Sequence, residues 1–507
     1  MTAYALIGLW TATSGHAAPV PDAQVAVGVP GFIGAAVTAA PLSPKPDADP
    51  WISTMHGDTD NANTSNHPGP LGTNPRIRSA TGQIGQFLWH RDGRLTSGYL
   101  DVADMSSGLA AVDPATMGVL AQWFPPPGEQ LNAVYMSLDA DDAVLVNSKQ
   151  GHIYRVRRTD PPVGPTFTML RDLDVRAELQ PGEQLLNSAY DSYGNIWFTT
   201  GAIPQVDANT PTTATIGYVT PDDRVHTIHL ADQTEEKGIT VHGATAYLLT
   251  APAGATDHPG AVGTLSALRA GPQGPNTLWQ ERFDAGSGIA PGGFARGSGT
   301  TPTVLGDRYV GIVDNADRQV HLLIYRQDSG ALICRVPLFT EGASYTDIGA
   351  IGYEENDRDS LVVLNGYHGP PLGVNPTAHD SAASVLAGIN NGYNNMNGMS
   401  PGVTRIDVAD GACSLAWQTP ERIKSVPVLS TRTGLVYGYT QDPDAAAAGL
   451  YVWYFEAIDF RTGRVAWKIR AGVGGTYNDT YRPGSLGPDG TFYQSVTLGV
   501  VALADAP

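Results

Sequence analysis

Apolar residues in this chain fall into short β-type runs, and clusters of Asp and Gly separate neighbouring runs. The clearest units read AAVDPATMGVLAQWF at 110–124, IDVADGACSLAWQTP at 406–420 and AIDFRTGRVAWKIRA at 457–471. In each, a β-rich run ends at Asp, a turn with Gly follows, and the next run carries Trp. Asp offers a side-chain hydrogen bond and Gly a positive φ, which tight hairpins require. The pattern therefore predicts a repeated strand–turn–strand unit.

A second element with the form D-x-x-G-x precedes most of these turns, as in DSYGNIWFTTG at 191–201 and GPDGTFYQSVT at 487–497. Together the two elements give about four short strands per repeat, which is the size of one propeller blade. The repeats fall at 84–125, 130–172, 185–230, 238–283, 300–339, 345–419, 424–471 and 482–505. The last has only three strands, and a ring must close. We expect an all-β, eight-bladed propeller, with seven blades as the alternative, in which Arg76–Ala80 supplies the missing strand.

The region ahead of the repeats divides into two parts. Residues 1–50 combine an apolar run, YALIGLW, a Gly-His-Ala-Ala sequence typical of a cleavage site, and an Ala/Pro-rich stretch. We interpret them as a leader-like segment and a flexible arm outside the fold, which favours an exported protein. Residues 51–83 form an N-terminal arm with the closing strand, and 84–507 form the propeller with an insertion at 366–399. The stretch at 24–40 is too short to span a bilayer.

Composition and charge narrow the possible partners. Charged residues make up 16% of the chain, with 59 Gly and 38 Pro, which suits short strands joined by tight turns. With 30 Lys and Arg against 49 Asp and Glu, the net charge is −19. Such a surface repels nucleic acid and anionic lipid. We expect a monomer that binds neither nucleic acid nor membrane.

Two cysteines, Cys334 and Cys413, stand at equivalent points near the ends of two repeats. Two are too few for a disulfide framework or a structural zinc site. If their repeats are adjacent blades, the thiols can meet in one inter-blade disulfide. Two buried free thiols are the alternative.

A family resemblance rests on the repeat itself. The phrase A-(I/V)-D-x-x-T-G-x-x-x-W at 457–467 and GPDGTFYQSVTLGVVAL at 487–503 resemble the repeat of quinoprotein-type (PQQ-like) β-propellers. From about 51 to 505, with SGTTPTVLGDRYVGIVDNAD at 298–317, the chain is similar to uncharacterised secreted propellers of actinobacteria. The first resemblance implies PQQ and calcium as candidate cofactors. The chain departs from many quinoprotein alcohol dehydrogenases because it has no vicinal cysteine pair.

Propellers usually bind ligands where the inner strands and their loops converge on the central channel. One candidate begins with the Ser298-Gly-Thr-Thr-Pro run, which leads into a predicted inner strand. After the next strand, Asp314, Asn315 and Asp317 place three oxygen-bearing side chains within four residues. Such oxygens suit calcium or the hydroxyls of a sugar, and Asp314 and Asp317 are candidate metal ligands and catalytic residues. A plain Asx turn is the structural alternative.

A second candidate lies in the N-terminal arm. Asp58 and Asp60 faintly resemble a calcium loop, but the Gly and closing Glu of an EF-hand are missing. His56 is a candidate acid or base, and Asp58 a candidate catalytic residue. The arm is equally able to lie across the channel mouth as a plug.

Two further regions are candidate ligand-binding loops. The insertion at 366–399 is long enough for a binding loop, and its Tyr367 and His368 suit hydroxyl-rich ligands. The connection into the eighth blade contains Asn478, Asp479 and Arg482. Arg482 has the geometry to clamp a carboxylate or phosphate. Pairing of Arg482 with Asp479 is the structural alternative.

The chain contains no G-x-S-x-G elbow, H-E-x-x-H motif or P-loop. The preferred hypothesis is therefore a secreted propeller that binds a polar small molecule or glycan at its channel, together with a structural cation. The alternatives are a quinoprotein-like dehydrogenase, a metal-assisted hydrolase or lyase, and a non-catalytic module that binds protein or cell wall. Enzymatic activity stays open at this point.

Overall fold

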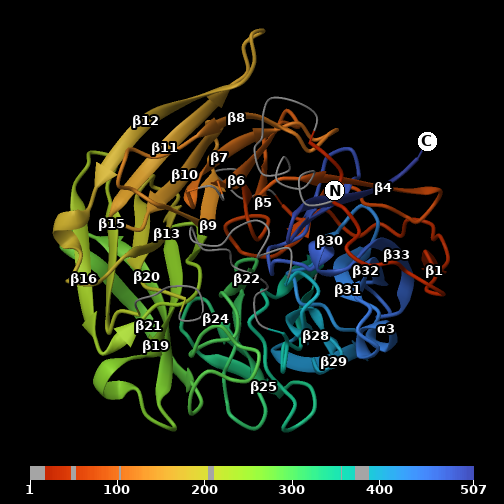
Figure 1. Cartoon of the computed structure of the whole chain (residues 1–507). Coiled ribbons are helices and arrows are strands. Elements are labelled where there is room, and N and C mark those ends of the chain that lie inside the picture. Colours follow the sequence, from red (N-terminus) through yellow and green to blue (C-terminus); the bar gives the residue numbers. More distant parts are fainter. Residues whose placement is uncertain are drawn as a thin grey trace.

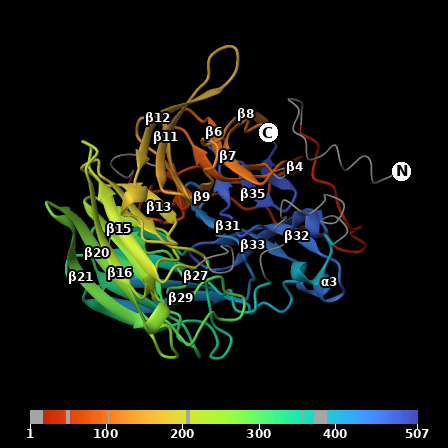
Figure 2. The same cartoon turned by 60° about the vertical axis from the view of Figure 1, so that its left-hand side comes forward.

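The computed structural model describes residues 17–46, 53–101, 104–203, 210–355, 357–370 and 388–506. Their strands form eight sheets. The sheets stand as blades around one axis, and the colours pass around the ring in chain order from orange through yellow and green to blue (Figure 1; Figure 2). The prediction of an all-β, eight-bladed propeller is confirmed.

The first four blades follow the predicted repeats closely. Blade 1 has β5 (Ile84–Trp89), β6 (Leu95–Asp101), β7 (Ser106–Val112) and β8 (Val119–Trp123). Blade 2 has β9 (Leu131–Leu138), β10 (Ala143–Ser148), β11 (His152–Thr159) and β12 (Thr166–Asp174). Blade 3 has β13 (Leu185–Tyr190), β14 (Ile196–Thr200), β15 (Thr213–Val219) and β16 (Val225–Ala231). Blade 4 has β17 (Gln233–Thr234), β18 (Thr240–His242), β19 (Thr245–Pro252), β20 (Val262–Gly271) and β21 (Gly274–Asp284).

The last four blades complete the ring. Blade 5 has β22 (Thr303–Leu305), β23 (Tyr309–Val313), β24 (His321–Arg326) and β25 (Leu332–Pro337). Blade 6 has β26 (Ile351–Glu355), β27 (Arg358–Leu364), β28 (Val403–Ala409) and β29 (Ala412–Thr419). Blade 7 has β30 (Val428–Ser430), β31 (Leu435–Gln441), β32 (Val452–Asp459) and β33 (Val465–Val473). Blade 8 has β34 (Ser485–Leu486), β35 (Phe492–Val496) and β36 (Gly499–Asp505).

Helical structure among the described residues is limited to single turns. They are α3 (Pro443–Ala447) and the 3-10 turns Arg176–Glu178, Gly254–Thr256, Gly392–Asn394 and Gly475–Tyr477. No helix of the described residues is long and apolar enough to cross a membrane.

The ring is closed by an N-terminal strand. β4 (Pro75–Thr81) pairs antiparallel with β36, in a register that runs from Gly499↔Thr81 to Asp505↔Pro75. Figure 1 shows this red strand beside the blue C-terminal strands. The predicted closing strand, Arg76–Ala80, lies within β4. Closure leaves no free edge on β36, which would otherwise invite pairing with another chain.

The core lies between neighbouring blades, and a tryptophan–glycine contact recurs there. Trp279 of blade 4 donates its Nε1–H to the carbonyl of Gln327 (2.7 Å), and its ring covers Gly330 in the outer turn of blade 5. Trp417 of blade 6 covers Gly463 of blade 7 in the same way. Both glycines have positive φ, and a Cβ would lie under 3 Å from the ring. The Gly and Trp of the repeat phrase thus pack together at two blade boundaries, between blades 4 and 5 and between blades 6 and 7.

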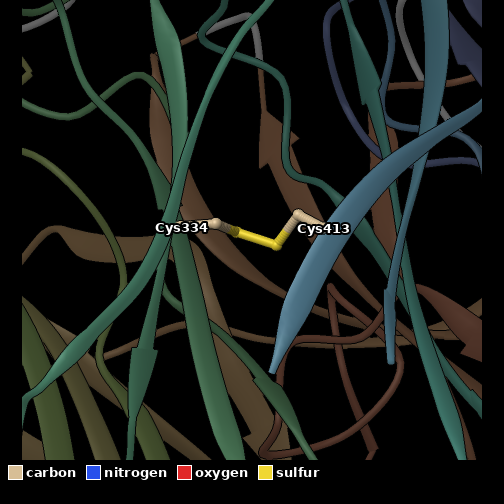
Figure 3. Close-up of a disulfide and its surroundings, with 2 residues drawn as sticks. All are labelled: Cys334 and Cys413. Carbon is tan, nitrogen blue, oxygen red and sulfur yellow. A yellow bond between two sulfur atoms is a disulfide. The ribbon is translucent and has the colours of Figure 1, made fainter. Parts of the chain in front are cut away.

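Cys334 of β25 and Cys413 of β29 form a disulfide between blades 5 and 6 (Figure 3). Their Cα atoms lie 6.2 Å apart, within the usual range for disulfides. The inter-blade disulfide is therefore the alternative that the structure supports, over two free thiols.

Residues 17–46 lie along the propeller instead of outside it. β1 (Phe32–Gly34) extends blade 7 by pairing with β33, with Phe32 opposite Ile469. Farther along, the Leu42 amide donates to the carbonyl of Thr431 (2.7 Å). The outer edge of β33 offers unpaired backbone groups, and this extended chain satisfies them. These residues form part of the folded surface and not the flexible arm that their composition predicts; residues 1–16, with the leader-like run, lie outside the described residues.

Candidate functional site

The central channel is crossed by residues 53–67, called here the channel segment. β2 (Ser53–Thr54) pairs with β9 of blade 2, and β3 (Thr64–Ser65) pairs with β30 of blade 7. Between them, the segment's carbonyls accept hydrogen bonds from inner-strand amides of blades 4, 5, 6 and 7: Thr59 from Val241, Asp60 from Val304, Ala62 from Gly352 and Asn63 from Leu429. The segment therefore satisfies the inner edges of successive blades and closes the channel, as the plug interpretation of this arm expects.

The two aspartates predicted as metal ligands surround a lysine. Lys45 Nζ contacts the carboxylate of Asp58 and lies 2.9 Å from that of Asp60. Asp60 also accepts a 2.8 Å hydrogen bond from Nδ1 of His242, whose Nε2 lies 3.0 Å from Asp307. The hydrogen bond to Asp60 raises the pKa of His242 to about 9. The charges of Asp58 and Asp60 are thus matched by side chains of the protein itself.

His56 is buried within the same segment and serves its turn. Its Nδ1 lies 3.0 Å from Oδ1 of Asn63. Burial lowers the pKa of His56 to about 4, so the imidazole is neutral at neutral pH. This arrangement positions Asn63, whose amide donates to the carbonyl of Ala350 in blade 6 (2.7 Å).

The three residues after β23 do not converge on one point. Asp314 accepts from the His321 amide (2.7 Å) and lies 3.0 Å from Nδ1 of that histidine, which fixes the β23–β24 hairpin. Asn315 donates to the carbonyls of Ala285 and Gly288. Asp317 accepts from Ser287 in the preceding loop. The structural alternative, a turn held by its polar side chains, describes these residues.

Tyr367 and His368 lie at the start of the insertion, with their rings 4.6 Å apart. His368 is exposed and has φ +57°, and its amide donates to the carbonyl of Pro291 (2.8 Å). The nearby loops therefore hold the backbone here, while the His368 ring faces solvent. Residues 371–387 of the insertion lie outside the described residues.

The connection into blade 8 brings two of the predicted residues together. Lys424 Nζ lies 2.9 Å from Oδ1 of Asn478 and 3.4 Å from Oδ1 of Asp479, and it stands 4.5 Å from the centre of the Tyr481 ring. Burial lowers the pKa of Lys424 and raises that of Asp479. Asp479 thus pairs with Lys424 and not with Arg482, so the proposed Arg482–Asp479 pair is not formed.

Further functional candidates lie in the connections that lead into other inner strands. We call 235–239, 344–350, 421–427 and 478–484 the rim loops. Asp347 accepts hydrogen bonds from the Tyr345 hydroxyl and from the Phe294 amide, and it pairs with Lys237. The Phe294 ring packs edge-on against Tyr481, with centroids 4.5 Å apart. Contacts of these side chains join the rims of blades 4, 5, 6 and 8.

Two adjacent glutamates of the blade 4 rim, Glu235 and Glu236, are buried, and each has one carboxyl oxygen without a hydrogen-bond partner. Glu235 accepts hydrogen bonds from Thr199 and from Asn187 (3.1 Å for the latter). Burial raises the pKa of Glu235 and of Glu236 to about 8. Both carboxyls are therefore largely protonated at neutral pH and able to donate a hydrogen bond.

Most of the rim side chains act on one another electrostatically, and Thr480 and Arg482 adjoin them in the sequence. The charge of Asp347 acts on Glu236 and on Tyr481, and that of Asp479 also acts on Tyr481. We call the group the rim cluster; it consists of Glu235, Glu236, Lys237, Tyr345, Asp347, Lys424, Asp479, Thr480, Tyr481 and Arg482. Tyr481 has φ +59°, a conformation that is costly for a non-glycine residue and that gathers at functional sites.

Sequence reasoning found the blade 8 part of this cluster and missed the parts from blades 4, 6 and 7. An acidic doublet such as Glu235-Glu236 usually marks a solvated surface, and burial of both carboxyls depends on blades distant in sequence. The position just ahead of each inner strand was the available signal.

Comparisons with known proteins assign no activity to the chain. No protein-family model matches the chain. A stretch of 248 residues is 25% identical to an uncharacterised protein of Archaeoglobus fulgidus, and it spans 45% of this chain and 46% of that protein. Among solved structures, the WD40 domain of SCAP from fission yeast is 9% identical, with TM-score 0.45 over 86% of this chain and 99% of that one. Sqt1 from Chaetomium thermophilum is 10% identical, with TM-score 0.46 over 84% and 97%. The class that the fold defines is the eight-bladed β-propeller.

The described residues do not fit a quinone with its cation. Among them, no group of three or more His, Cys, Asp or Glu side chains is placed to hold a metal ion. Trp279 and Trp417 are docked between blades and offer no floor for a flat cofactor at the rim. The repeat resemblance therefore extends to the propeller architecture alone.

Proposed function

We propose that the protein binds a polar small molecule at the rim cluster. The observation that carries this proposal is a set of buried polar atoms on the rim loops that have no hydrogen-bond partner. They are Oε1 of Glu235, Oε2 of Glu236, Oδ2 of Asp479, Oγ1 of Thr480 and Oγ of Ser425. A buried polar atom without a partner costs about 1–3 kcal/mol, and such atoms are rare in native proteins.

A hydroxyl-rich ligand matches the chemistry of these atoms. The protonated Glu235 and Glu236 donate or accept hydrogen bonds, whereas the Asp479 carboxylate only accepts. The channel segment crosses the channel and bonds to the inner strands of blades 4 to 7, and the rim loops lead into inner strands of the same ring. A concave site with a few convergent polar groups is the usual form of a small-molecule site.

The test is calorimetric binding of a panel of hexoses, polyols and sugar acids to the full chain and to Thr480→Val. We expect the variant to be as stable as the parent, because it loses only an unpartnered hydroxyl, and to bind the best ligand about 3–10-fold more weakly, which corresponds to one hydrogen bond.

Thr404→Val is the matched control, because Thr404 carries an equally buried and unpartnered hydroxyl in β28, away from the rim loops. It should leave binding unchanged. Equal effects of the two substitutions, or no binding by any member of the panel, would contradict the proposal.

A second candidate function, a hydrolase or lyase, is favoured by one observation. Burial raises the pKa of Glu235 and of Glu236 to about 8, and carboxyls whose pKa values are raised toward the working pH suit general acid–base work. Turnover on the best ligand should then fall by at least 100-fold in Glu236→Gln, with its affinity retained. Retained turnover in that variant would exclude Glu236 as the acid.

We further propose that the chain works outside the cytoplasm. The Cys334–Cys413 disulfide supports this, because disulfides persist in oxidising compartments. Protein purified from its native compartment and denatured under alkylating conditions should contain no free thiol. Two free thiols per chain would place it in a reducing compartment.

A further inference from the structure

Arg482 stands in the rim loop of blade 8 without an acidic partner. Its carbonyl accepts a hydrogen bond from Nε2 of Gln494 (3.1 Å), which fixes the backbone. Its side chain lies over Gly85 of β5, where an added Cβ would come within 2.5 Å of both Cδ and Nη1. Glycine at position 85 thus makes the room that this side chain occupies. Within the described part of the chain, no hydrogen bond or ion pair engages the guanidinium.

The other interior cations of the rim and channel are all paired. Lys45 contacts Asp58 and Asp60, Lys237 contacts Asp347, and Lys424 contacts Asp479. The chain carries 49 acidic against 30 basic residues, so carboxylates are plentiful. Arg482 therefore differs from these lysines, because it has no carboxylate partner although the protein is rich in carboxylates.

Leaving this charge uncompensated is unfavourable for the free protein. Burial lowers the pKa of Arg482, and no carboxylate offsets the effect. A guanidinium nevertheless stays charged in proteins, so the cost is not relieved by loss of a proton. Arg482 keeps part of its surface exposed, so the residue is accessible from solvent.

We propose that the ligand of the rim cluster carries an oxyanion, a carboxylate or phosphate group, and that Arg482 binds it. This inference rests on the proposed function and specifies its ligand class. The guanidinium fork matches the two oxygens of a carboxylate or phosphate in a bidentate contact. Asp479 and Thr480 of the same loop are then left for the hydroxyl groups of the same molecule.

The experiment measures equilibrium binding of four probes at one ionic strength: D-glucose, D-glucuronate, D-glucose 6-phosphate and inorganic phosphate. We expect at least one of the three anions to bind 10-fold or more tightly than glucose. Arg482→Gln should remove that preference, and Arg482→Lys should retain only part of it, because an ammonium keeps the charge without the planar fork.

The matched control is Arg464→Gln, which removes the same charge from an exposed arginine whose side chain makes no hydrogen bond or ion pair among the described residues. It should leave all four affinities unchanged. Without ligand, Arg482→Gln should melt at the same temperature as the parent or higher. A purely structural arginine would instead lower the melting temperature when replaced.

Gly85→Ala provides a second, independent variant. The guanidinium stays in the protein, but the added methyl displaces its stem, so anion binding should weaken while glucose binding is kept.

The outcomes separate the two proposals. If glucose binds as tightly as the anions and Arg482→Gln changes nothing, the oxyanion inference fails while small-molecule binding stands. If no probe and no member of the wider panel binds, both fail. Whether glucuronate or the phosphates show the preference identifies the anionic group.

Discussion

At the scale of single residues, His242 makes stability depend on pH. Hydrogen bonding to Asp60 raises the pKa of His242 from 6.5 to about 9 in the folded protein. The stabilisation is therefore complete below pH 6.5 and is lost as the pH rises through 9. Because the side chain is 29% exposed, solvent screening reduces the effect to about 1 kcal/mol. In urea unfolding, the free energy of unfolding of the parent should be about 1 kcal/mol larger than that of His242→Gln at pH 6. At pH 10 the two free energies should be equal.

His226→Gln is the control for this experiment, because His226 stacks on Tyr218 and has no carboxylate partner among the described residues. Its difference from the parent should not change between pH 6 and pH 10. If the two histidine variants show the same pH dependence, the contact with Asp60 is not responsible.

The residue scale also shows how far the sequence predicts the site. The sequence predicts Asn478, Asp479 and Arg482 at the rim because they precede an expected inner strand, and in the structure they lie in the connection ahead of β34. The sequence predicts a metal site at Asp58 and Asp60 because no local pattern shows that Lys45 lies between their carboxylates. Residue contacts of this kind depend on chain packing, which local patterns do not encode.

At the scale of elements, the tryptophan–glycine contact between blades explains why the repeat phrase requires both residues. Gly330→Ala should lower the free energy of unfolding by about 2–3 kcal/mol, from the strain of a positive φ and from the clash with the Trp279 ring. Gly411→Ala is the matched control: its φ is also +72°, and no atom lies within 4 Å of an added Cβ. It should cost only about 1 kcal/mol. Chemical denaturation of both variants measures the difference, and equal losses would contradict a role for the tryptophan.

The disulfide links β25 to β29 at a boundary where no tryptophan of β25 docks. It joins cysteines 79 residues apart, so closing that loop in the unfolded chain is worth about 4 kcal/mol in the chain-entropy model. Cys334→Ser/Cys413→Ser should lose about 3–4 kcal/mol of unfolding free energy, measured without reductant. Adding reductant to the parent should reproduce the loss and should not affect the double variant; a parent insensitive to reductant would contradict this role.

Element boundaries were the most predictable feature of the fold. The first repeat was expected at 84–125, and its strands span 84–123, because Asp-Gly turns mark the hairpins locally. The path of residues 17–46 was not predictable in this way. Their Ala/Pro-rich sequence has no strand periodicity, and their partner, the outer edge of β33, exists only once blade 7 has formed.

At the scale of the whole molecule, the N-terminal region holds the ring together in two ways. β4 completes blade 8, and the channel segment bonds to the inner strands of five other blades. A chain that begins at residue 83 lacks both. It should expose the edge of β36 together with unpaired inner-strand amides, and therefore aggregate or associate instead of remaining a monomer. Size-exclusion chromatography with far-ultraviolet circular dichroism reads out the change.

A chain that begins at residue 17 provides the comparison, because it keeps β1, the channel segment and β4. It should elute as a compact monomer with a cooperative melt. A chain that begins at residue 53 separates the two contributions: it keeps the channel segment and β4 but loses Lys45, so Asp58 and Asp60 lose their shared cation. Folding of this chain with reduced stability would show that pairing closes the ring and that Lys45 secures the channel segment. A soluble, cooperatively folded chain beginning at residue 83 would show instead that the blades associate without either contribution.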